Sequence, residues 1–141
     1  MNNETVKLTQ LIYACWLAAD GSTGRSTEAL PTAQGVMDYT LKDLKDDPLF
    51  PDWARKALHF SVRDSGLTCL ELSEIRLYAN RLGVTSDPNP SYVRTTMTVN
   101  GKMAPLFSRL AEIDTEAAEK LGKKMRTKVN EYTSVLSSSV A

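Results

Sequence analysis

The 141-residue chain is long enough for one domain with a single hydrophobic core. Hydrophobic residues make up 42% of it and charged residues 24%, and the formal net charge is zero, so no overall charge draws the chain to nucleic acid or to an anionic membrane. The longest apolar run, residues 11–19, is far shorter than the about 20 residues that a membrane-spanning helix needs.

The first predicted element is a helix over residues 5–19. Lys7, Thr9 and Gln10 are its only polar residues after the first position, so apolar side chains surround it almost completely. A helix that is apolar on all sides is buried on all sides, and we expect this one at the centre of the fold.

The composition of residues 20–27 predicts a loop. A second helix is expected over residues 32–46, with these side chains facing inward: Val36, Met37, Tyr39, Leu41 and Leu44.

Two further helices are predicted in the middle of the chain. The third covers residues 51–64, where Pro51 suits a first turn and an apolar face opposes a basic one. The fourth covers residues 69–82, because Thr68 and Glu71 match a capping box and Gly83 is placed to end the helix.

Residues 91–103 fit two structures. Alternating β-branched residues and the Asn100–Gly101 pair indicate a hairpin, whereas Pro90 could open a short helix; we slightly favour the helix because few other strands are expected. Helices are also predicted from about Pro105, and from Thr115 to about Tyr132.

These elements predict a mainly α fold. We expect a single-domain bundle of five to six helices in residues 1–133, arranged around a buried N-terminal helix, with a possible short β-hairpin at 92–103. Residues 134–141 are expected to form a polar C-terminal tail.

No motif predicts catalysis or a cofactor. The loop at 20–27 lacks the lysine and spacing of a phosphate-binding loop, and the single histidine, His59, has arginines four residues away on either side rather than an orienting carboxylate. Cys15 and Cys69 show no zinc or disulfide pattern. We therefore expect no enzyme, no metal site and no small-molecule cofactor. The lack of a disulfide pattern indicates a reducing compartment, and the sequence shows no signal-peptide pattern. We therefore expect a cytoplasmic protein.

Two basic helix faces are candidates for contact with a nucleic-acid backbone, because lysine and arginine neutralise phosphates. The first lies on helix 51–64 and the second on the last helix. Their residues are Arg55, Lys56, His59 and Arg63, and then Lys120, Lys123, Lys124 and Arg126.

Helix 69–82 has apolar residues on two opposite faces. Leu72, Ile75 and Tyr78 belong to a core-facing side, whereas Leu70 and Leu77 fall on the other side. Apolar residues on an outer face indicate a protein partner. The predicted partner-binding residues are Leu70, Glu74, Leu77 and Arg81.

The leading prediction is a non-catalytic helical interaction subunit of a multi-protein or nucleoprotein assembly, acting through helix 69–82 with a protein partner or by self-association. The alternative is a winged-helix DNA-binding protein with helices 52–63 and 69–82 and a wing at 92–103. In that alternative Arg76, Asn80 and Arg81 would read the duplex.

Overall fold

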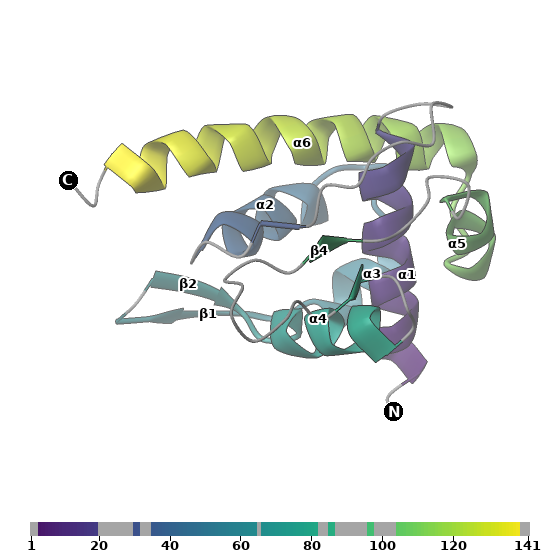
Figure 1. The fold of residues 1–141 in the computed structure, drawn as a ribbon, viewed down its shortest axis with the longest axis horizontal. Helices are drawn as coiled ribbons and strands as arrows, with labels where there is room; N and C mark the ends of the chain where they lie inside the picture. Colours follow the sequence, from purple (N-terminus) through teal and green to yellow (C-terminus); the bar gives the residue numbers. More distant parts are fainter. Residues whose placement is uncertain are drawn as a thin grey trace.

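A computed structural model describes residues 3–19, 30, 31, 35–64, 66–81, 85, 86, 96, 97 and 104–138. Within these ranges the chain is mainly helical, as predicted, with six helices and four short strands (Figure 1). In chain order they are α1 (Asn3–Ala18), α2 (Val36–Lys45), α3 (Asp52–Ala57), β1 (Phe60–Arg63), β2 (Gly66–Cys69), α4 (Leu72–Arg81), β3 (Thr85–Ser86), β4 (Thr96–Met97), α5 (Ala104–Leu110) and α6 (Thr115–Ser138).

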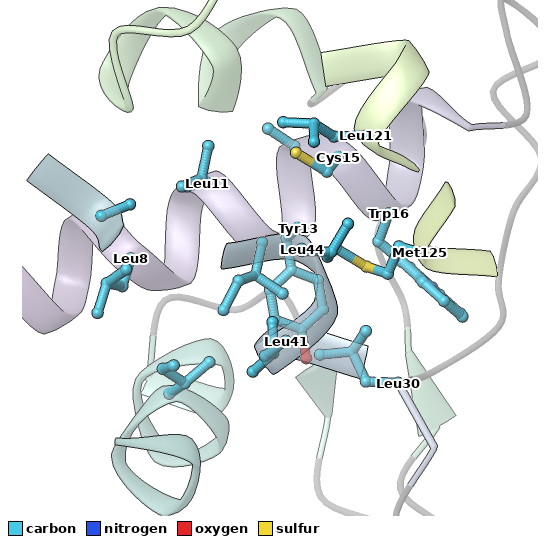
Figure 2. Packing of buried hydrophobic residues seen from close by; sticks show 14 of the residues in the cluster. Leu8, Leu11, Tyr13, Cys15, Trp16, Leu30, Leu41, Leu44, Leu121 and Met125 are labelled. Atoms are coloured by element: carbon cyan, nitrogen blue, oxygen red, sulfur yellow. The ribbon is translucent and has the colours of Figure 1, made fainter. Parts of the chain in front are cut away.

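Helix α1 is the central element, which confirms the prediction from its apolar surface. Every residue from Leu11 to Ala18 is buried. It lies against α6, α5, α4 and α3, and α6 runs along one side of the molecule across the C-terminal end of α1 (Figure 1). Figure 2 shows the resulting core, in which side chains of α1 meet those of α2 and α6: Tyr13, Cys15, Trp16, Leu41, Leu44, Leu121 and Met125.

The crossing of α1 and α6 is very close at Gly122. A Cβ atom on Gly122 would lie 1.9 Å from the backbone oxygen of Cys15 and 3.1 Å from the Cβ of Ala19. Because real Cβ contacts are never this short, only glycine permits the two backbones to approach so closely here. The absence of a side chain at Gly122 therefore sets the distance between α1 and α6, and with it the position of α6 on the core.

Helix α2 packs against α6 nearer the C-terminal end of that helix. Its predicted inward residues Val36, Met37, Leu41 and Leu44 are buried, whereas Tyr39 is half-buried and stacks on Tyr132 with ring centroids 5.3 Å apart.

Polar contacts extend this α2–α6 junction. The Tyr132 hydroxyl donates to the carboxylate of Asp43, and Lys124 pairs with Asp47 at 2.9 Å. The acidic residues near the end of α2 therefore help to hold α6.

The predicted helix 51–64 is wrong in its second half. Helix α3 ends at Ala57, and β1 pairs antiparallel with β2 in a register that joins Phe60 to Cys69 and Arg63 to Gly66. Leu58 is fully buried in an extended conformation, and its carbonyl accepts from Lys45 at 3.0 Å, so that oxygen is not left for another helical turn. Gly66 has φ 111°, a value that favours glycine and suits the hairpin.

The predicted capping box of helix 69–82 is also wrong. Thr68 lies in β2, and α4 begins only at Leu72. The Glu71 carboxylate instead accepts from the backbone N–H of His59 at 2.7 Å and contacts His59 Nδ1 at 2.9 Å, so it ties the base of the hairpin together. Glu71 thus binds His59, which is distant in the sequence, and not the nearby capping-box partner that the sequence indicated.

Part of the 91–103 segment can be compared with prediction. Residues Thr96–Met97 form β4, which pairs antiparallel with β3, so the favoured helix is wrong there. The remainder of the expected hairpin at 92–103 lies outside the described residues.

The C-terminal helices follow the prediction, but the last is longer. Asp114 accepts from the backbone N–H groups of Glu116 and Ala117 and so caps the start of α6. The helix continues to Ser138, because Leu136 still packs against the core. Residues 134–138 are therefore helical, and the helix extends beyond its predicted end near Tyr132.

We predict that Gly122→Ala destabilises the protein by about 2 kcal/mol or more, because the new methyl group overpacks the α1–α6 crossing. Helix propensity alone would give the opposite sign, a gain of about 1 kcal/mol. Urea unfolding followed by circular dichroism measures the difference. Lys123→Ala, at the neighbouring exposed position, is the control and should change stability little; a Gly122→Ala protein as stable as wild type would contradict the close crossing.

Candidate functional site

Leu70 and Leu77 are both on the surface, as the sequence predicts. Leu70 is 44% and Leu77 47% exposed, and Glu74 between them is exposed as well. Leu70 lies in the turn that joins β2 to α4 rather than within the helix. The side chain of Arg81, the fourth predicted partner-binding residue, lies outside the described residues. We call Leu70, Glu74 and Leu77 the α4 surface.

The other side of α4 is packed into the protein. Leu72, Ile75, Tyr78 and Ala79 are all buried, with Ile75 and Ala79 completely so. At 100° per residue Leu77 falls opposite this buried side. Helix α4 therefore has one core face and one exposed face that carries a leucine, as its sequence predicts.

A cleft of about 390 Å³ lies beside the α4 surface, between the start of α2, the β1–β2 hairpin and the start of α4. Its lining combines two guanidinium groups, one carboxylate and two hydroxyls with apolar side chains. The residues are Gly35, Asp38, Arg63, Leu67, Thr68, Cys69, Leu70, Leu72, Ser73 and Arg76.

Hydrogen bonds position the walls of the cleft. Asp38 of α2 accepts from the backbone N–H of Cys69 at 2.7 Å, which fixes the outer edge of β2 against α2. Arg76 of α4 donates from Nη2 to the carbonyl of Pro31 at 3.0 Å. Sequence reasoning missed this cleft, because the residues that form it are far apart in the chain and the hairpin that brings them together was predicted as helix.

Burial disfavours the ionised form of both described thiols and of the core tyrosine Tyr13. Burial raises the pKa of Cys15 to about 12, and burial is also the main cause that raises the pKa of Cys69 to about 12. The backbone N–H groups of Glu71 and Leu72 donate to the Cys69 thiol, so this side chain caps the beginning of α4. Burial likewise raises the pKa of Tyr13 to about 12, although the nearby Arg76 opposes it.

The structure does not assemble the first predicted basic face. Arg55 donates to the carbonyls of Lys45, Asp47 and Phe50 and to the carboxylate of Asp52, so it stabilises the turn before α3. The other three residues, Lys56, His59 and Arg63, are exposed, but they lie on α3, in the segment between α3 and β1, and on β1 instead of on one helix.

The second basic face is divided between surface and interior. Lys120 and Lys123 are exposed and pair with glutamates one turn earlier in α6. Lys124 pairs with Asp47 of the α2–α3 turn. Arg126 lies over the Trp16 ring, 3.8 Å from its centroid, and donates to the Trp16 carbonyl at 2.8 Å. Lys124 and Arg126 therefore attach α6 to the rest of the fold.

The first helix and the turn of the predicted helix-turn-helix are not formed, although α4 covers most of its second helix. Its first helix, expected over 52–63, ends at Ala57, and the residues expected to form its turn contribute to β2. Arg76 is engaged with Pro31, and the side chains of Asn80 and Arg81 lie outside the described residues.

Two further properties concern the described part of the chain. It holds no group of three or more histidine, cysteine or acidic side chains placed to bind a metal ion. None of its helices combines the length and apolarity needed to cross a membrane.

Comparison with known proteins gave no match: no family model, no curated protein and no solved structure is similar to this chain.

We predict that Arg126→Gln lowers the free energy of unfolding by about 1–3 kcal/mol, because it removes a charged hydrogen bond and a cation–π contact with Trp16. Lys120→Gln and Lys123→Gln remove the same charge from exposed positions and should each change stability by less than about 0.5 kcal/mol. Urea denaturation of the three variants tests this. Equal effects of all three would mean that Arg126 has no structural role.

Proposed function

We propose that this protein is a non-catalytic helical interaction subunit that binds a partner protein through the α4 surface. One observation carries the proposal: α4 is packed on one face, yet Leu77 on the opposite face and Leu70 in the preceding turn stay nearly half exposed. An exposed surface that places leucines beside a charged residue has the composition of a protein-binding patch.

The surrounding structure supports this proposal. Leu70 follows a β-strand whose edge is fixed by Asp38, and it precedes a helix whose other face is in the core, so its backbone is held from both sides. A rigid, preformed surface loses little conformational entropy when it binds. The exposed carboxylate of Glu74 favours a partner that presents an apolar side chain next to a basic one.

A nucleic-acid role has less support from the described contacts. Three of its predicted residues, Arg55, Lys124 and Arg126, use their donors within the protein. The exposed Lys120 and Lys123 have glutamate partners, which reduces the positive charge that they present. A protein partner therefore fits the observations better than nucleic acid.

We predict that the double variant Leu70→Glu/Leu77→Glu weakens partner binding by about 100-fold or more, because two apolar contacts become charges at the interface. The tagged protein is purified from its source, its stoichiometric partner is identified, and binding of the purified pair is measured by isothermal titration calorimetry. Self-association, the second form of the proposal, is measured by analytical ultracentrifugation.

Leu110→Glu is the matched control, because Leu110 on α5 is 46% exposed and distant in sequence from the α4 surface. Its binding should equal that of wild type. Circular dichroism and urea unfolding should show that all variants keep the fold. A double variant that binds as tightly as wild type would remove the α4 surface from the proposal.

A further inference from the structure

Two helix N-termini meet at the cleft beside the α4 surface. Gly35 and Asp38, at the start of α2, line one side of it, and Leu72 and Ser73, at the start of α4, line another. Each helix has ten residues, and the N-terminus of a helix carries roughly half a positive charge. The cleft therefore receives positive potential from two backbone segments in addition to its side chains.

Among the described residues, some backbone N–H groups at both helix ends have no acceptor. No described side chain caps α2, whose N-cap residue Gly35 has φ 87°. At α4 the Cys69 thiol accepts from Leu72, but no acceptor for the backbone N–H of Ser73 is found in the described part of the chain. Unsatisfied N–H groups at helix N-termini are a common binding site for anions.

Side-chain charge in the cleft has the same sign. Two guanidinium groups, those of Arg63 and Arg76, stand against the single carboxylate of Asp38. Arg63 is exposed at the end of β1 and forms no ion pair with another described residue. Arg76 donates to Pro31 through Nη2, but its Nε atom is buried and has no acceptor within the described ranges. Arg76 is therefore held in place and contributes its positive charge to the cleft, whereas its buried Nε is not accessible to a ligand.

We propose that this cleft binds an organic phosphate, with the phosphate group near the two helix N-termini and the arginines, and an apolar body against Leu67, Leu70 and Leu72. A phosphate offers three strong acceptor oxygens and up to two negative charges, which suits several donors and outweighs the nearby Asp38 better than a carboxylate does. The volume of about 390 Å³ exceeds the space that phosphate alone needs and lies within the range of small-molecule sites. Leu70 belongs to both the α4 surface and the cleft, so the test of phosphate binding uses the isolated protein without a partner.

The test is a titration of the isolated, ¹⁵N-labelled protein followed by NMR at constant ionic strength and pH. The probes are phenyl phosphate, inorganic phosphate and benzoate. Phenyl phosphate should give saturable shifts concentrated on the amides of residues 35–38 and 72–74, and it should bind about tenfold more tightly than inorganic phosphate, because its ring covers the leucines. Benzoate should bind more weakly than phenyl phosphate, because it offers fewer acceptors and less charge.

Variants locate the site. Arg63→Gln should weaken phenyl phosphate binding about tenfold, whereas Lys123→Gln, which removes the same charge from α6, should leave it unchanged. Ser73→Ala is a second exposed variant that keeps the core intact. It should also weaken binding, through the loss of its hydroxyl, and it serves if Arg63→Gln disturbs the hairpin.

Three results would overturn the proposal. One is the absence of saturable shifts at the cleft amides with either phosphate probe. Another is a set of shifts that is spread over the lysines of α6 and is reduced as much by Lys123→Gln as by Arg63→Gln. That result would indicate general charge attraction. The third is benzoate binding as tightly as phenyl phosphate, which would mean that the site does not select phosphate.

Discussion

The close contact between α1 and α6 at Gly122 is the constraint on which the rest of the structure depends. Because Gly122 has no Cβ, the backbone of α6 rests on the Cys15 carbonyl, and Leu121 and Met125 then reach the core around α1. Farther along, α6 meets α2 through the Tyr39–Tyr132 stack. Helix α2 is thus positioned by α1 and α6 together, and it in turn provides the wall against which the hairpin packs.

The hairpin converts this helical core into a surface with distinct chemistry. Asp38 holds β2 through the backbone of Cys69, and Glu71 holds the hairpin base through His59. These two contacts bring the start of α4 close to the start of α2 and leave Leu70 at the rim of the cleft. The exposed leucines and the electropositive cleft are therefore neighbours because of one supersecondary element. Both proposals depend on this element, although each has its own ligand and its own experiment.

Sequence patterns predicted the elements whose structure depends on the periodicity of their own residues. The buried α1, the inward side chains of α2 and the two-faced nature of α4 follow from apolar periodicity alone. The hairpin at 60–69 was missed because Trp53, Ala57 and Phe60 have helical spacing and Thr68 and Glu71 match a capping box, whereas their actual partners are tertiary: Leu58 with Lys45, and Glu71 with His59. The β-branched residues Val62 and Thr68 on either side of Gly66 were the signal that could have indicated strands. The cleft and the role of Gly122 depend on how distant helices meet, and no local pattern encodes that.

Native mass spectrometry of the protein purified from its source, with and without nuclease treatment, tests the central claim that this chain works by binding another protein. The expected result is a complex heavier than the 15.6 kDa monomer, composed of protein subunits, whose mass is unchanged by nuclease. A monomer under conditions that preserve weak complexes would contradict it, as would an assembly that falls apart when nucleic acid is digested.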